Sequence, residues 1–271
     1  MGAASVNRIT IRFDDEGAGS APPLLLVHGH PFDRTMWRPQ VKAFGRPGQQ
    51  VIAPDLRGYG KSSVVTGKTT LDVFARDLGA ILDACGVTGR IVICGLSMGG
   101  QIVMEFCRLF PDRVAGIALA ATAPQSETDE GKRARNAMAN RLLREGMKPY
   151  AEEALPKMLA ARSIRALPAV AEHVLGMMRQ AHPAGAAAAL RGRAERPPYE
   201  DVLAGLDIPA LIVVGDEDAF TTREDAERMH ALMKRSELVW LEGVGHMPNL
   251  EREAEFNAAL ERLLGAVRAA A

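Results

Sequence analysis

A serine lies at the centre of the most informative motif in this chain, where a short apolar run leads directly into a helical pattern. Residues 91–94 are Ile-Val-Ile-Cys, and Gly95-Leu-Ser97-Met-Gly99 follows them. This Gly-x-Ser-x-Gly context predicts a tight strand-to-helix turn that exposes the hydroxyl of Ser97 as a nucleophile. The flanking glycines remove side chains that would collide across the turn. The free amides and positive dipole end of the following helix suit a developing oxyanion.

A serine hydroxyl is a poor nucleophile at neutral pH, so Ser97 needs a base, and the base needs an orienting acid. The sequence places Asp-Glu-Asp at 216–218 after one apolar run and His246 after another. The chain order serine, acid, histidine fits three loops at one sheet edge. We predict that His246 is the base and that Asp218, among the three competing carboxylates, orients it. The competing explanation is that Asp216, Glu217 and Asp218 are all solvated turn residues.

Two backbone amides are needed to hold an oxyanion. We predict that one belongs to Met98, directly after the nucleophile. The second is the amide of His30, in a loop that begins as the apolar run Leu25-Leu-Val ends at His28. His28 and His30 also have the side chains of metal ligands, but no third ligand cluster accompanies them. We therefore predict no metal site and no cofactor.

Apolar and aromatic side chains near these loops, together with methionines of the middle segment, are candidates for a substrate pocket. The candidates are His28, Phe32, Trp37, Met138, Met158, Met177, Phe220 and Met247. Packing within the core is the competing explanation for each methionine. Five arginines of the middle segment are candidates for gripping a substrate carboxylate, although most are expected on solvated helix faces. They are Arg141, Arg144, Arg162, Arg165 and Arg179.

Short apolar runs that alternate with helical patterns must position these residues, and this alternation predicts a mainly parallel sheet. We expect strands at 9–13 (an edge strand), 24–27, 51–53, 91–94, 116–120, 210–214 and 238–241. We expect helices at 70–85, 98–110, 223–234 and 253–267. The unusual residues follow the strands, where an open α/β sheet binds its ligand.

A helical insertion interrupts this rhythm. Residues 124–196 contain no strand-like run and are rich in Ala, Met, Leu, Arg and Glu. Helices are expected at 132–144, 150–160, 166–179 and 184–193, separated by prolines. We predict an α/β core formed by 1–123 and 197–271, with 124–196 as a lid over the carboxyl edge of the sheet. A peripheral helical subdomain is the alternative.

Bulk composition narrows the class of ligand. Thirty-three basic residues balance thirty-three acidic ones, so no net field draws the chain to nucleic acid or an anionic membrane. A small neutral substrate and a monomer or homo-oligomer are expected. The three cysteines have neither metal-ligand nor redox spacing, and no apolar stretch is long enough to span a bilayer. A cytoplasmic location is the resulting expectation.

Several motifs taken together resemble the α/β-hydrolase superfamily. They are His28-Gly-His30-Pro31, Trp37, Asp55-Leu-Arg-Gly-Tyr-Gly-Lys-Ser62, Gly95-Leu-Ser-Met-Gly-Gly100, Gly215-Asp-Glu-Asp218 and Gly243-Val-Gly-His246. The resemblance is greatest to capped arylesterases with cofactor-free haloperoxidase activity and to 3-oxoadipate enol-lactonases. It implies an eight-stranded sheet with an antiparallel second strand, helices on both faces and a helical cap after the sixth strand. It also implies a structural role for 55–60, and His30 departs from it where an apolar residue is common.

The expected chemistry is hydrolysis of a small carboxylic ester or lactone through an acyl-enzyme, since relatives that cleave haloalkanes or epoxides carry aspartate in place of Ser97. Perhydrolysis at the same site is an alternative, because peroxide can replace water in deacylation. A biosynthetic thioesterase, cyclase or lyase keeps the same triad. The non-enzyme alternative is a receptor-like protein that closes its lid on a ligand.

Overall fold

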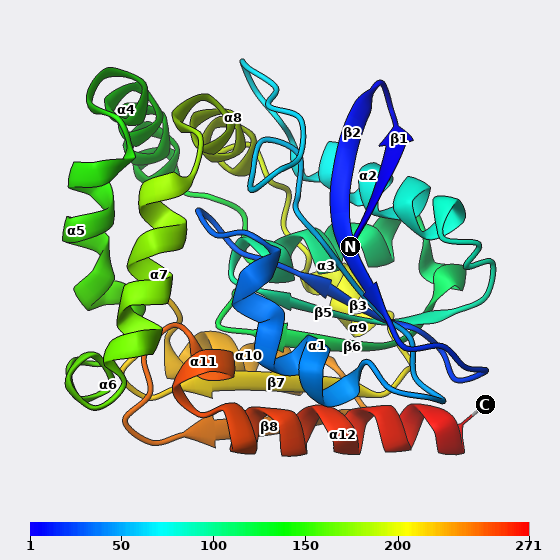
Figure 1. Cartoon of the computed structure of the whole chain (residues 1–271). Helices are drawn as coiled ribbons and strands as arrows, with labels where there is room; N and C mark the ends of the chain where they lie inside the picture. Colours follow the sequence, from blue (N-terminus) through cyan, green and yellow to red (C-terminus); the bar gives the residue numbers. More distant parts are fainter. Residues whose placement is uncertain (271) are drawn as a thin grey trace.

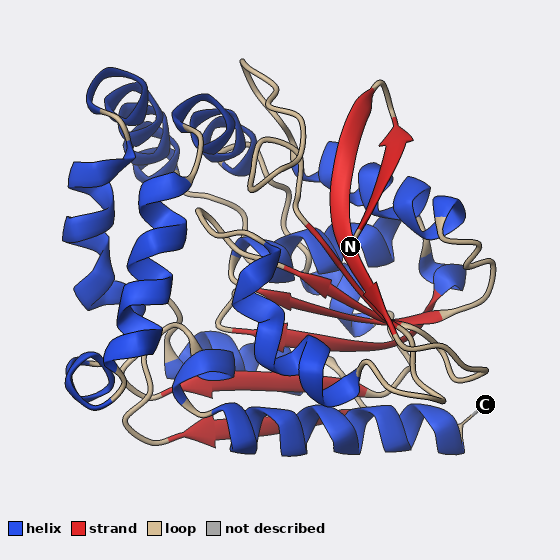
Figure 2. Ribbon diagram, in the orientation of Figure 1, coloured by secondary structure: helices blue, strands red, loops and turns tan. Residues whose placement is uncertain are grey.

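The computed structural model describes residues 1–270, in which eight strands form one sheet with helices on both faces (Figures 1 and 2). The strands are β1 (Gly2–Val6), β2 (Ile9–Glu16), β3 (Leu24–Val27), β4 (Val51–Pro54), β5 (Ile91–Leu96), β6 (Val114–Ala120), β7 (Ala210–Gly215) and β8 (Ser236–Leu241). Their order across the sheet is β1-β2-β4-β3-β5-β6-β7-β8. β2 runs antiparallel to both of its neighbours, β1 and β4, as the resemblance implies, and every other pair of neighbouring strands is parallel.

The seven apolar runs all become strands, but residues 9–13 are not at the edge of the sheet. They belong to β2, and β1 pairs with its outer side in antiparallel register. The prediction of an edge strand at 9–13 was therefore wrong. β1 was missed because exposed and partly buried residues alternate along it and only Val6 is buried, so the segment contains no apolar run.

Two hydrophobic cores form on the two faces of the sheet because successive strand residues point to opposite sides. Leu25 and Val27 of β3 belong to one core, and Leu24 and Leu26 belong to the other. Helices α2, α3, α9 and α10 contact one another beside the first core, and α1 and α12 contact each other beside the second. The bounds are α1 (Arg38–Phe44), α2 (Leu71–Ala84), α3 (Met98–Leu109), α9 (Glu200–Ala204), α10 (Arg223–Leu232), α11 (Pro248–Glu251) and α12 (Glu253–Ala269).

A helical segment separates β6 from β7. It consists of α4 (Asp129–Glu145), α5 (Met147–Met158), α6 (Ala161–Ala166), α7 (Pro168–Gln180) and α8 (Pro183–Arg193). Figures 1 and 2 show these helices gathered at the end of the sheet toward which the parallel strands point. The short helix α6 was not predicted, because a run of six residues carries too little periodicity to be recognised.

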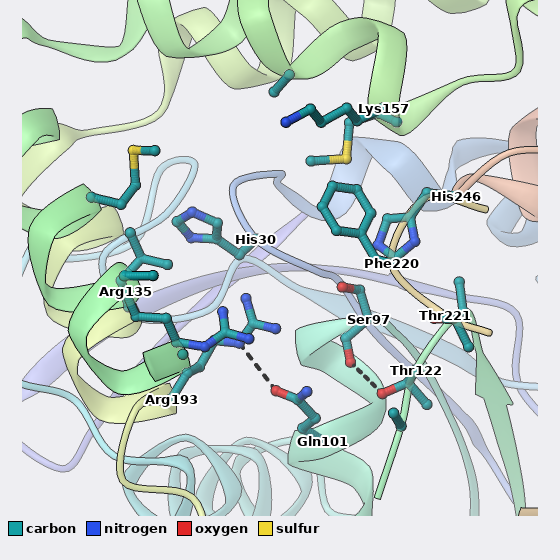
Figure 3. A pocket seen from close by; sticks show the side chains of 18 of the residues that line it. His30, Ser97, Gln101, Thr122, Arg135, Lys157, Arg193, Phe220, Thr221 and His246 are labelled. Carbon is teal, nitrogen blue, oxygen red and sulfur yellow. Dashed lines mark hydrogen bonds between the residues drawn. The ribbon is translucent and has the colours of Figure 1, made fainter. Parts of the chain in front are cut away.

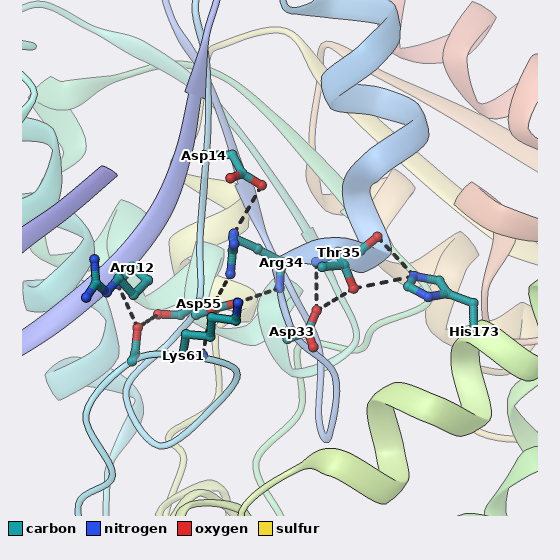
Figure 4. A network of polar contacts seen from close by, with 9 residues as sticks. Arg12, Asp14, Asp33, Arg34, Thr35, Asp55, Lys61 and His173 are labelled. Carbon is teal, nitrogen blue, oxygen red and sulfur yellow. Dashed lines mark hydrogen bonds and ion pairs between the residues drawn. The ribbon is translucent and has the colours of Figure 1, made fainter. Parts of the chain in front are cut away.

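A buried ionic network fixes the loops that precede this segment (Figure 4). The carboxylate of Asp55 accepts hydrogen bonds from the amide and guanidinium of Arg34 and from the amide of Lys61, at 2.9, 2.5 and 2.8 Å. Arg34 also pairs with Asp14 of β2. Asp55 is fully buried, so losing one partner would leave an uncompensated charge. The network supports the structural role that the resemblance implies for residues 55–60.

None of the helices within residues 1–270 combines the length and apolar character that a membrane-spanning helix requires. Cys94 and Cys107 are buried, and Cys85 is half-buried. Burial raises the pKa of the Cys85 thiol to about 11 and that of Cys107 to about 12. These thiols are therefore protonated and unreactive at neutral pH.

Candidate active site

Ser97 occupies a strained turn between β5 and α3. Its φ and ψ are 57° and −116°, a conformation that few residues other than glycine adopt. The turn is held by the amide of Ser97, which donates to the carbonyl of Ala120 at 2.9 Å. A side chain on Gly99 would place its first carbon 2.1 Å from the carbonyl oxygen of Val27, so only glycine fits there. The surroundings thus maintain the strain and present the hydroxyl.

His246 and Asp218 meet at the ends of β8 and β7. The Nδ1 atom of His246 lies 2.9 and 3.0 Å from the two carboxylate oxygens of Asp218. Both side chains are nearly inaccessible, at 3% and 0% exposure. A buried carboxylate on Nδ1 fixes the tautomer that leaves Nε2 able to accept a proton.

The environment keeps Asp218 ionised. Burial acts to raise its pKa, but His246 and the amides of Phe220 and Thr221 outweigh burial and lower the pKa below its ordinary value. The amide of Phe220 donates to Asp218 at 2.8 Å. Asp216 instead accepts from the amides of Gly243 and Val244. Of the three acids, Asp218 is the one in contact with the imidazole.

Ser97 and His246 line the same cavity, whose volume is 470 Å³ (Figure 3). The ring of Phe220 packs edge-on against His246, with the ring centroids 4.8 Å apart. Among the contacts of residues 1–270, no hydrogen bond joins the Ser97 hydroxyl to the ring. Catalytic contacts of this kind commonly tighten only when substrate binds.

The loop after β3 runs beside the nucleophile. A side chain on Gly29 would place its first carbon 3.3 Å from Cβ of Ser97. Two backbone amides near the nucleophile belong to His30 and Met98. Neither donates to a backbone carbonyl among the turn and loop contacts of the described chain. The loop therefore runs close enough to Ser97 to supply a second oxyanion donor.

The two histidines of this loop have separate roles. His28 is fully buried, donates from Nδ1 to the carbonyl of Gly29 at 2.9 Å, and accepts at Nε2 from the amide of Leu56 at 2.9 Å. Burial lowers its pKa, so the ring is neutral and joins two loops. His30 lines the cavity, and its Nδ1 lies 2.8 Å from the Tyr59 hydroxyl.

Three of the eight proposed pocket residues line the cavity, namely Met138, Met158 and Phe220. The other five pack elsewhere in the described chain, which corrects the prediction for His28, Phe32, Trp37, Met177 and Met247. Apolar packing explains four of them, since they belong to the core beside α1 and α12, and His28 instead joins two loops. Trp37, for example, packs against Phe256 with their ring centroids 6.0 Å apart.

The charged residues that line the cavity were missed. None of the five arginines proposed from sequence is among its lining residues, and Arg135, Arg193 and Arg196 line it instead. Arg141 and Arg179 form exposed ion pairs, and Arg162 donates to the carbonyls of Glu242 and Gly243. The alanine run at 186–189 could have indicated that Arg193 is buried. Small residues allow α8, which ends at Arg193, to pack closely against the core.

Glu251 was not predicted from the sequence, although it holds the loop that carries His246. Its carboxylate accepts from the amides of Gly245, Met247 and Ala160 at 3.0, 3.2 and 2.9 Å. Glu251 is 3% exposed. It therefore joins the residues on both sides of His246 to the segment between α5 and α6.

We expect Glu251→Gln to lower the free energy of unfolding by about 1–3 kcal/mol, because an amide cannot accept from all three donors. Ester turnover, if His246 is the base, falls mainly through kcat. Chemical denaturation and steady-state kinetics measure the two effects. Glu253→Gln, at an exposed position two residues on, is the matched control. An unchanged denaturation midpoint with unchanged kcat would remove this role from Glu251.

The fold and the elbow serine define the class, an α/β hydrolase. A family model described as alpha/beta hydrolase family matches residues 24–259, so the chain belongs to that family. The family and the esterase and lactonase relatives below support an enzyme that acts on esters.

Several relatives cover nearly the whole chain. A 3-oxoadipate enol-lactonase from Acinetobacter baylyi is 27% identical over 256 residues, covering 94% of this chain and 93% of its own length. A bifunctional esterase/perhydrolase from Acinetobacter calcoaceticus is 27% identical, with 90% and 92% covered. The solved structure of a thermophilic esterase from Thermogutta terrifontis with malate bound superposes with a TM-score of 0.92 at 39% identity, covering 96% of this chain and 94% of that one.

Proposed function

We propose that this protein hydrolyses small carboxylic esters or lactones through a serine acyl-enzyme. The observation that carries the proposal is the buried Asp218–His246 pair on the cavity that Ser97 also lines. A base held by an ionised acid, on the same cavity as a serine, is the arrangement that acyl transfer requires. The names of the relatives agree with it, since they include an enol-lactonase and an esterase/perhydrolase.

In the proposed mechanism, Nε2 of His246 takes the Ser97 proton as the hydroxyl oxygen attacks the substrate carbonyl. The amides of Met98 and His30 hold the oxyanion, and Asp218 stabilises the imidazolium. His246 then protonates the leaving alcohol, which departs from the acyl-enzyme. Water, deprotonated by His246, attacks the acyl-enzyme and releases the acid and the free serine.

Residues 124–196 are proposed as a cap on a core formed by 1–123 and 197–271. In support, Met138, Tyr150 and Met158 of α4 and α5 line the cavity beside Ser97. The cap is attached to the core near the base, because the amide of His246 donates to the carbonyl of Met158 at 3.0 Å. Substrate selection would then depend on cap side chains.

A fluorophosphonate probe followed by peptide mass spectrometry tests the proposal, together with a panel of esters and lactones varied in chain length and charge. We expect stoichiometric labelling at Ser97 and turnover of part of the panel. Adding hydrogen peroxide measures peracid formation, the activity that the name of the Acinetobacter calcoaceticus relative suggests. A protein that is not labelled, turns over nothing and binds a small molecule unchanged would be a receptor instead.

A further inference from the structure

Three guanidinium groups line the active-site cavity, but only two of them pair with a carboxylate. They belong to Arg135, Arg193 and Arg196. Glu127 pairs with Arg135 and, at 2.7 Å, with Arg196. Among the ion pairs of residues 1–270, none includes Arg193. The other acid on the cavity wall, Glu153, is paired with Arg141 at 2.6 Å.

Arg193 therefore carries a buried charge without a counter-ion. It is 8% exposed, and its side chain makes one hydrogen bond within the described chain, from Nε to the neutral Oε1 of Gln101 at 3.0 Å. Burial, followed by repulsion from Arg135 and Arg196, lowers the pKa of Arg193 well below its usual value. Because a guanidinium stays protonated in proteins, the charge remains in the buried site without compensation. A bound anion would supply that compensation.

The backbone holds Arg193 firmly in this position. It is the last residue of α8, and the amide of Thr69 in the core donates to the carbonyl of Ala188 at 3.0 Å. A side chain on Gly192 would place its first carbon 1.6 Å from the carbonyl oxygen of Thr69, so helix and core are in direct backbone contact. The partner of Arg193, Gln101, lies one turn after Ser97 on α3, about 6 Å along the helix axis.

His30 adds an unpartnered ring nitrogen to the same cavity. The ring is 5% exposed, and its Nε2 has no partner within residues 1–270. Burial and the nearby Arg193 lower the pKa of His30 well below 6.5, so the ring is neutral. In the tautomer in which Nδ1 accepts from the Tyr59 hydroxyl, Nε2 carries the hydrogen and can donate to a ligand.

The positions of these donors indicate which part of the substrate they face. In Figure 3, His30, Arg135 and Arg193 lie on one side of Ser97 and His246 lies on the other. His246 must protonate the leaving group, so the leaving group lies on its side. The acyl part therefore extends toward Arg193.

On the basis of the ester-hydrolase function proposed above, we propose that Arg193 and His30 bind a carboxylate on the acyl part of the substrate. The preferred substrates are then half-esters or lactones of short dicarboxylic acids, in place of neutral esters. The guanidinium matches a carboxylate through paired N–H groups, and the buried setting strengthens each contact.

A matched pair of esters tests this inference. The mono-4-nitrophenyl ester of glutaric acid carries a terminal carboxylate, and 4-nitrophenyl pentanoate has the same chain length without it. We expect the wild-type kcat/KM to favour the glutarate ester by about tenfold or more, and Arg193→Met to reduce this ratio by about tenfold to a hundredfold. Arg193→Lys restores part of the preference. Arg179→Met, on an exposed arginine paired with Glu152 outside the cavity, leaves the ratio unchanged.

Calorimetric binding of glutarate to the wild-type protein provides a readout independent of turnover. We expect glutarate to bind more tightly than pentanoate, and Arg193→Met to weaken glutarate by about tenfold or more. Equal kcat/KM for the two esters, with glutarate binding no tighter than pentanoate, would overturn the carboxylate site while leaving ester hydrolysis intact. Hydrolysis of neither ester nor of any panel ester or lactone would overturn the proposed function, and Arg193-dependent glutarate binding would still support the site. If Arg193→Met does not fold, the proposal is tested by the ratio of the two kcat/KM values in the wild-type protein and in Arg193→Lys.

Discussion

Ester turnover is expected to fall by about 10⁴-fold or more in Ser97→Ala, because the substitution removes the atom that forms the acyl-enzyme. The loss should appear in kcat, with KM for a 4-nitrophenyl ester changed much less. The residual rate would come from the oxyanion amides and from positioning of the substrate. Labelling by a fluorophosphonate should disappear as well, since no other hydroxyl occupies the elbow.

The substitution is expected to remove the hydroxyl without changing the backbone conformation. Alanine meets the same steric restriction as serine at the φ of 57° observed at this position, so the turn has no reason to relax. Ser5→Ala on the exposed edge strand β1 is the control for serine removal as such. A folded Ser97→Ala protein, verified by circular dichroism and free of wild-type contamination, that kept turnover within tenfold of the parent would exclude Ser97 as the nucleophile.

Local signals allowed most of the sheet to be predicted. Buried parallel strands such as 24–27 and 210–214 are continuous apolar runs. Such runs can be recognised without knowing which strands lie beside them. β1 is different, because its pairing with β2 rather than its composition makes it a strand. An edge strand half exposed to solvent leaves almost no apolar signature.

The candidate triad could be predicted for a similar reason, and the cavity lining could not. Ser97, Asp218 and His246 each follow a recognisable strand, and parallel strands bring their carboxyl ends to one edge. Which face of a cap helix turns inward depends on contacts between distant segments. Met177 and Arg179 occupy one helix, yet Met177 is buried in the core and Arg179 forms an exposed ion pair.

The exposure of an arginine side chain cannot be predicted from its charge alone. An arginine on a helix is normally solvated, which is the correct expectation for Arg141 and Arg144. Arg193 is exceptional because the preceding small residues bring α8 against the core. Its exposed fraction of 8% follows from the packing of the backbone, and no feature of the arginine itself reveals it.

Asp218→Asn should reduce kcat/KM by about 10³- to 10⁴-fold with little change in fold. The carboxylate accepts from Nδ1 of His246 at 2.9 and 3.0 Å, and an asparagine amide would offer a donor in place of one acceptor. The imidazole would then favour the wrong tautomer, and the imidazolium formed during attack would lose its counter-charge. Because the pKa of Asp218 is held below its ordinary value, the wild-type carboxylate stays charged at neutral pH and loses this role only under strongly acidic conditions.

The neighbouring acids provide controls within the same loop. Glu217→Gln changes an exposed carboxylate and should leave kcat/KM at the wild-type value. Asp216→Asn weakens the contacts to the amides of Gly243 and Val244, so it should reduce stability more than turnover. Steady-state kinetics and denaturation of the three variants separate these effects. If Asp218→Asn stayed within tenfold of wild type while Asp216→Asn lost most turnover, the orienting role would belong to Asp216, and the imidazole would have to turn away from its present partner during catalysis.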